Sequence, residues 1–126
     1  MSRLKTFFTM LCMVLTLPVA TRADQPIELR LFAECAGRLS ASVEHAWLVG
    51  ADDTALSAQK DGFADLIEAL AGASDRVQVM DWRVRAKMDH KRLLSLSVFA
   101  TEPRLARLAE MQAQAHQNRC GAVLLG

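Results

Sequence analysis

The stretch IELRLFAECAGRLSASVEHAWLV, residues 27–49, decides the fold. Its apolar and small side chains recur every three or four positions, the spacing of one helical face; they are Phe32, Cys35, Ala36, Leu39, Val43, Ala46 and Trp47. The pattern predicts a helix that ends near Gly50 and buries one side. The small residues Gly37 and Ser42 on this helix would allow another helix to approach closely.

Two further helices follow from local signals. Residues 51–54 predict a loop that ends in the capping residue Thr54. A helix over 55–71 comes next, with its apolar positions at Leu56, Phe63, Leu66, Ile67 and Leu70. Thr101, Glu102 and Pro103 predict the start of a last helix that runs to about Leu124. One face of that helix carries Leu105, Leu108, Ala109, Gln112, His116, Cys120 and Val123.

Residues 75–100 can be interpreted in two ways. The alternation around residues 82–88 resembles a strand, but no second strand signal is present, and a lone strand cannot pair its backbone groups. A helix is therefore expected, with one apolar face at Val77, Met80, Val84, Met88, Ser95 and Phe99. A second strip comprises Trp82, Ala86, Leu93 and Ala100, so this helix should touch two neighbours. The sequence predicts an all-α, up-down-up-down four-helix bundle.

Residues 1–23 have the pattern of a secretory signal peptide. Arg3 and Lys5 precede an apolar run over residues 7–20, and small residues stand before a cleavage point after Ala23. The run is shorter than the roughly 20 residues that span a bilayer, so a membrane anchor is not expected. The prediction is a periplasmic protein with one domain, residues 24–126, and no transmembrane span after cleavage.

Cleavage would change the charge and the cysteine count. Without Arg3, Lys5 and Arg22, 12 of the 15 basic residues remain against 14 acidic ones, and the formal charge changes from +1 to −2. This balance gives no indication of nucleic-acid binding. Cys12 is also lost, which leaves the pair Cys35 and Cys120.

The two remaining cysteines predict a structural disulfide. They lie near the start of the first helix and near the end of the last, and these ends are neighbours in an up-down-up-down bundle. A bond between Cys35 and Cys120 would close a span of 85 residues, worth about 3–4.7 kcal/mol in the chain-entropy model. Their separation differs from the Cys-x-x-Cys spacing of redox pairs.

Histidines offer a weak alternative as metal ligands. His116 lies one turn before Cys120, and Cys35 would be a third ligand, although a disulfide sulfur is a poor one. Haem would need an axial methionine, Met80 or Met88, opposite His116 or His45. Neither a Cys-x-x-Cys-His motif nor a Gly-x-Ser-x-Gly elbow is present, and the serines fall within the expected helices. We therefore expect neither a cofactor nor an enzyme.

A basic stripe is the remaining surface feature. Arg76, Arg83, Lys87 and Lys91 share one side of the third helix. The stripe would suit an anionic surface, such as lipid headgroups or cell-wall polymer, or an acidic protein partner. The alternative is a solvated face that Asp81 and Asp89 balance.

Three short segments resemble one group of proteins. They are Glu34-Cys35-Ala36-Gly37-Arg38, the stretch from Asp81 to Lys87, and Arg119-Cys120-Gly121-Ala122. Together they resemble uncharacterised small secreted two-cysteine helical proteins of alphaproteobacteria. The resemblance implies a periplasmic location and an all-helical fold, but no site residue. The expected function is non-catalytic binding of another envelope macromolecule; the alternative is a haem- or metal-binding bundle.

Overall fold

The computed structural model describes residues 25–126, which form four α-helices and a short 3₁₀ turn. The helices are α1 (Gln25–Val49), α2 (Thr54–Leu70), α3 (Arg76–Phe99) and α4 (Pro103–Leu125), and the turn η1 (Ala73–Asp75) precedes α3. This range contains no strand, so the all-α class and the helix over residues 75–100 are confirmed. The predicted signal peptide, residues 1–23, lies outside the described residues.

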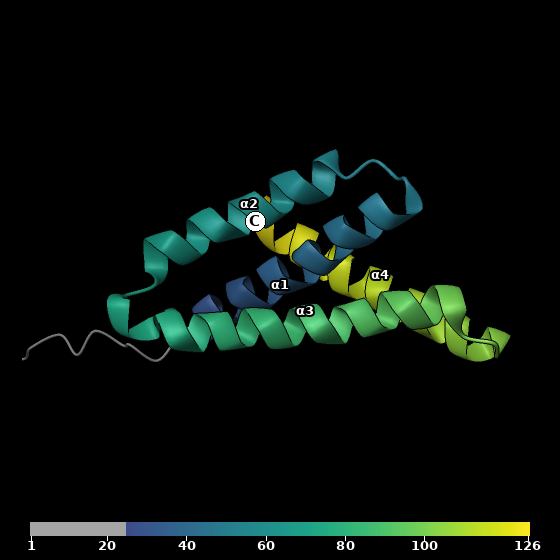
Figure 1. Cartoon of the computed structure of the whole chain (residues 1–126). Helices are drawn as coiled ribbons and strands as arrows, with labels where there is room; N and C mark the ends of the chain where they lie inside the picture. Colours follow the sequence, from purple (N-terminus) through teal and green to yellow (C-terminus); the bar gives the residue numbers. More distant parts are fainter. Residues whose placement is uncertain (1–24) are drawn as a thin grey trace, which may run out of the picture.

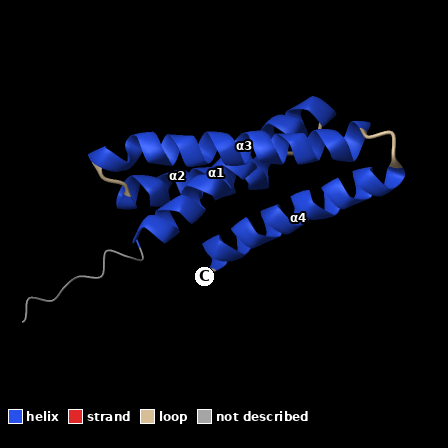
Figure 2. Cartoon of the chain, turned by 90° about the horizontal axis from the view of Figure 1, so that it is seen from below, coloured by secondary structure: helices blue, strands red, loops and turns tan. Residues whose placement is uncertain are grey.

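Successive helices run in opposite directions, which confirms the up-down-up-down order (Figure 1). α1 is the most buried helix and packs along both α3 and α2. α4 lies mainly along α3 and meets α1 and α2 over a smaller area. Figure 2 shows α4 running back from the turn at the far end of α3. The bundle is therefore arranged around α1, with α3 between α1 and α4 in much of its length.

The turns that reverse the chain are set by short-range contacts. Gly50 ends α1 with φ of 69°, in the left-handed region that glycine adopts without steric cost. Asp52 then accepts hydrogen bonds from the hydroxyl and the backbone N–H of Thr54, at 2.6 and 3.1 Å. These bonds lower the pKa of Asp52, the side-chain bond more than the backbone one. Pro103 occupies the first turn of α4, where its missing N–H has no helical partner to lose.

Gly37 sets the distance between α1 and α3. A Cβ atom at this position would overlap the backbone carbonyl oxygen of Arg83 on α3. Because backbone cannot move aside as a side-chain tip can, only glycine permits this approach. The expected close contact at Gly37 is confirmed, and it explains why α1 and α3 form the most extensive helix pair.

The main hydrophobic core lies around α1 and receives side chains from α2, α3 and α4. Phe63 of α2 is completely buried, and its ring centre lies 5.9 Å from that of Phe32. The buried members of this core are Leu29, Ala33, Cys35, Ala36, Leu39, Phe63, Ile67, Val79 and Cys120. Most of them come from α1, as the spacing of residues 27–49 predicted.

The disulfide between Cys35 and Cys120 is confirmed and lies inside this core. Both residues are 0 % exposed, and the Cα atoms are 5.6 Å apart. The bond fastens the first half of α1 to the last turns of α4, two helices that otherwise share a small contact. The covalent link therefore holds together elements that packing alone joins weakly.

One of the two apolar faces expected to be packed on α3 is exposed. Val77, Met80, Val84 and Met88 are each at least half exposed, so that prediction is wrong for these residues. The inward face instead carries Val79, Ala86, His90 and Leu94, all buried. Ala86 belongs to the second predicted strip, whose other members Trp82, Leu93 and Ala100 are partly buried, and that strip is confirmed.

Apolar side chains at the helix ends depart from the prediction in the same way. Trp47 is 63 % exposed, although it was placed on the buried face of α1. Leu105 and Leu108 of α4 are also exposed, because α4 is covered on one side only at that end. Among residues 25–126, no helix has the length and hydropathy needed to cross a membrane.

Candidate functional site

A buried polar cluster joins α1, α3 and α4. The Ser42 hydroxyl of α1 lies 3.0 Å from Nε2 of His90 on α3, and the Gln117 amide of α4 donates to this hydroxyl at 2.7 Å. Ser42 and His90 are 3 % and 1 % exposed. Polar groups this deeply buried are costly unless they are hydrogen bonded, so the three side chains depend on one another.

The hydrogen bonds favour one tautomer of His90. The Ser42 hydroxyl has one hydrogen and two lone pairs, and the carbonyl oxygen of Arg38 lies 3.2 Å away as an acceptor. When the hydroxyl donates to Arg38, it accepts from both Gln117 and His90 Nε2–H, and all three bonds form. If it donated to His90 instead, the bond to Arg38 would be lost and a hydrogen on Nδ1 would have no acceptor. The favoured arrangement leaves the Nδ1 atom of His90 with a lone pair.

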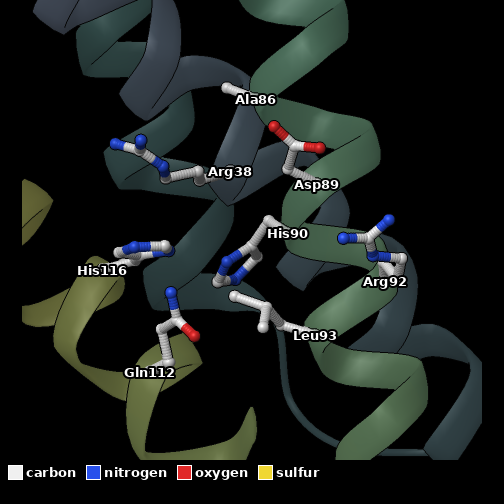
Figure 3. Close-up of a pocket in the computed structure, with 8 residues that line it drawn as sticks. All are labelled: Arg38, Ala86, Asp89, His90, Arg92, Leu93, Gln112 and His116. Carbon is white, nitrogen blue, oxygen red and sulfur yellow. The ribbon is translucent and has the colours of Figure 1, made fainter.

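His116 faces His90 across the same space (Figure 3). The two ring centres are 5.8 Å apart, and the ring planes are tilted by 38°. The Nδ1 atoms of both histidines are buried and have no hydrogen-bond partner among the described residues. Two buried ring nitrogens without a partner are unusual, because most buried polar atoms in proteins find one.

Both imidazoles are uncharged at neutral pH. Burial lowers the pKa of His90 to about 4, with smaller contributions from the nearby charges of His116, Arg38 and His45. Burial also lowers the pKa of His116, followed by Arg38 and Arg119. Neutral imidazoles keep their lone pairs available, which is the form that accepts a hydrogen bond or binds a metal ion.

A cavity of about 350 Å³ adjoins the two rings. Its polar walls come from Arg38, Asp89, Arg92 and Gln112, together with the histidines (Figure 3). Arg38 also donates to Glu34 at 3.3 Å, so part of its charge is balanced within α1. Asp89 and Arg92 carry opposite charges on the outer wall. The cavity is therefore polar, and its lining carries more positive than negative charge.

The predicted ligand set around His116 does not form. Cys35 and Cys120 are bonded to each other, and within residues 25–126 no three or more His, Cys, Asp or Glu side chains gather as metal ligands. Met80 and Met88 are exposed and do not line the cavity, so neither lies opposite His116 as an axial ligand would. The structure instead brings His116 beside His90.

Sequence reasoning overlooked His90, although a signal was present. It lies four residues after Ala86 and four before Leu94, on one helical face, and both neighbours are buried. The prediction placed an apolar strip on the opposite side of α3 in the interior, so the buried pattern around His90 was not recognised. A histidine centred in a helical strip of small and apolar residues is a candidate for a buried, functional or structural position.

The basic stripe is divided by the fold. Arg76 and Lys91 are exposed, whereas Arg83 and Lys87 are partly buried. Lys87 forms an ion pair with Glu44 of α1, and Arg83 lies where α3 meets Gly37. Binding of an anionic surface by the stripe stays a prediction, but two of its four members are engaged in packing against α1.

Besides those of α4, the exposed apolar side chains among residues 25–126 include two groups, on α3 and where α1 and α3 end. The first, the outer stripe of α3, consists of Val77, Met80, Val84 and Met88. The second is a cleft of about 400 Å³ where α1 and α3 end, with Trp47, Leu48 and Phe99 on its rim. The side chains of Leu48 and Phe99 are 82 % and 78 % exposed. Exposed apolar groups this large and this close together are typical of surfaces that other molecules cover.

Comparison with protein-family models, curated proteins and solved structures finds no match to this chain.

Proposed function

We propose that this protein acts without catalysis in the bacterial periplasm, where it binds another macromolecule of the cell envelope. The signal-like pattern of residues 1–23 supports export. The disulfide is compatible with an oxidising compartment. One observation carries the binding role, the exposed apolar outer stripe of α3 with the apolar cleft beyond its end.

The outer stripe has the spacing of a helix–helix contact surface. Its residues follow one another at intervals of three, four and four positions, so they lie along one line on α3. Each is at least half exposed, and Val77 is 84 % exposed. A helix or an apolar groove of a partner could bury this line, in the way amphipathic helices are commonly recognised.

A protein partner fits better than an anionic polymer. The exposed members of the basic stripe, Arg76 and Lys91, are 15 residues apart, about 22 Å along the helix axis. That distance exceeds the screening length of about 8 Å at physiological ionic strength, so the two charges would act separately. The apolar stripe is continuous over most of the same length. We therefore assign the partner-binding role to Val77, Met80, Val84 and Met88.

Site-specific photo-cross-linking in living cells tests this proposal. A photoreactive residue at Val84 should give a discrete cross-linked product, whereas one at Ala64, an exposed position on α2, should give none. The variant Val84→Glu should reduce the product formed from a cross-linker at Met88 by several-fold. The matched variant Ala64→Glu should not.

Equal amounts of cross-linked product from Ala64 and Val84 would contradict the proposal. So would a product from the cross-linker at Met88 whose amount Val84→Glu leaves unchanged. Thermal unfolding of both glutamate variants provides the control for folding. Because Val84 and Ala64 are both exposed, neither substitution should change the midpoint by more than a few degrees.

A further inference from the structure

We propose that Nδ1 of His90 and Nδ1 of His116 together bind one divalent transition-metal ion of the Cu²⁺ or Zn²⁺ type in the cavity between α1, α3 and α4. This site is separate from the outer stripe of α3 and does not depend on the proposed partner binding. It shares His116 with the set of ligands that the sequence indicated, but His90 replaces the two cysteines.

The first step is the state of the two nitrogen atoms. Both Nδ1 atoms are buried and lack a partner among the described residues, and His90 is 1 % exposed. A lone pair in such a position is satisfied by a hydrogen-bond donor or by a metal ion. The cavity beside the rings provides the space, since about 350 Å³ exceeds the volume of an ion with several bound waters.

Second, Ser42 and Gln117 fix the tautomer and the orientation of the His90 ring. Histidines that bind metal ions commonly donate their other ring N–H to a fixed acceptor, which sets the tautomer and the direction of the lone pair. Ser42 has this relation to Nε2 of His90, at 3.0 Å, and Gln117 holds Ser42 in turn at 2.7 Å. The buried cluster thus presents the Nδ1 lone pair of His90 in advance of any ligand.

The third step is the distance between the rings. Metal–nitrogen bonds of about 2.1 Å place the centres of two imidazoles about 5–6 Å apart when both bind one ion at a tetrahedral or wider angle. The ring centres of His90 and His116 are 5.8 Å apart. In Figure 3 the two rings extend toward each other from α3 and α4, with Gln112 beside them. This separation lies within the range expected for two imidazoles that bind one ion.

The fourth step is the chemical class of the ion. Neutral imidazole suits Cu²⁺, Ni²⁺ and Zn²⁺, whereas Mg²⁺ and Ca²⁺ require oxygen ligands. The positive charge of Arg38, which lowers the pKa of both histidines, also opposes a cation, but its ion pair with Glu34 and the Asp89 carboxylate on the wall reduce this repulsion. Two protein ligands leave the other positions to water. Among these ions the Irving–Williams order favours Cu²⁺.

Calorimetric titration of the purified protein, prepared without a polyhistidine tag, tests the site. We expect one equivalent of Cu²⁺ to bind, Zn²⁺ to bind more weakly, and Mg²⁺ to give no heat. His116→Gln should weaken Cu²⁺ binding at least tenfold, and because His116 is only partly buried this variant should fold. The matched control His45→Gln, which changes the remaining histidine outside the pair, should stay within about twofold of the unchanged protein.

Electron paramagnetic resonance of the Cu²⁺ form gives an independent readout. It should show two nitrogen ligands in the unchanged protein and one in His116→Gln. Ser42→Ala, which removes the positioning hydroxyl, should lower affinity about tenfold while two nitrogens remain bound. Ser42→Thr should restore most of the affinity.

Three results would overturn the proposal. They are the absence of Cu²⁺ binding to the folded protein, equal affinity in the unchanged protein and His116→Gln, and loss of binding in His45→Gln. Any of them would mean that water satisfies the two Nδ1 atoms, or that the ion binds elsewhere.

Discussion

The interior around Cys35 and Cys120 contains large apolar side chains, whereas the interior around His90 contains small residues and a polar cluster. The first region has Leu39 and Phe63 completely buried and a covalent bond between helices. In the second, the apolar cluster consists of Ala41, Leu94 and Ala113, with Leu93 packed against it.

The difference has a consequence for function. Large side chains fill the space between helices, so the disulfide region is suited to stability. Small side chains at Ala41 and Ala113 let polar groups and a cavity occupy the interior beside them. The region around His90 thus has space beside buried polar groups, and the disulfide in the other region holds together the helices that form it.

Removal of the disulfide should give the largest loss of stability. Cys35→Ser, Cys120→Ser and the double variant should each lose about 4 kcal/mol of unfolding free energy, because all three remove the same closed span of 85 residues. Urea unfolding measures this loss. Additive losses from the two single variants would show that the sulfur atoms act separately.

Truncation of one buried side chain in each interior compares how much the two regions contribute to stability. Phe63→Ala should lower the unfolding free energy by about 3–5 kcal/mol, since it leaves a cavity in a filled core. Leu94→Ala should cost about 2 kcal/mol, because its cluster is small and lies beside existing space. Chemical denaturation of both variants checks the order, and an equal or reversed order would remove the distinction between the regions.

Acid should weaken the His90 region selectively. The pKa of His90 is about 4 in the folded protein, against 6.5 for an ordinary histidine. Since the folded value is the lower one, the unfolded chain takes up the proton first, and stability falls as the pH decreases from about 6.5 through 4. The part due to His90 should reach about 2–3 kcal/mol.

Urea unfolding at several pH values measures this loss. In His90→Gln the dependence on pH between 7 and 4 should be flatter by that amount, because the titrating ring is gone. In His45→Gln it should stay close to that of the unchanged protein. Parallel curves for the unchanged protein and His90→Gln would show that other groups cause the acid sensitivity.

The smallest effect concerns the ion pair that joins α1 and α3 between the two regions. Lys87 and Glu44 are each about one third exposed, at 34 % and 37 % of the side chain. A double-mutant cycle with Lys87→Gln and Glu44→Gln should give a coupling below about 1 kcal/mol. A larger value would mean that this contact, and not only Gly37, holds α3 against α1.

Much of the fold could be predicted from local patterns. The periodicity of residues 27–49 identified the helix that became the centre, and Gly50, Gly72 and Pro103 marked the helix ends within a few residues. The pairing of Cys35 with Cys120 followed from helix order together with the number of cysteines that the predicted cleavage would leave. The helix predictions succeeded because each depends on a signal carried by neighbouring residues, and the disulfide because two cysteines leave a single pairing.

The candidate site could be predicted only in part. His116 was identified as a possible ligand, but its partner on α3 was not, because α3 has apolar residues on two sides and the sequence does not rank them. The close approach of α1 at Gly37 and the hydrogen bonds of Ser42 select the side that carries Ala86 and His90. The side that carries Val84 and Met88 is left exposed.

The sequence by itself determined the number, order and direction of the helices and the covalent bond between the first and the last. Helix periodicity, capping and cysteine count act over short distances or leave a single pairing. Only the tertiary structure decided which face of α3 is buried and that His90 meets His116. Those outcomes depend on how closely three helices approach one another, and that distance depends on side chains far apart in the sequence, such as Gly37 and Arg83.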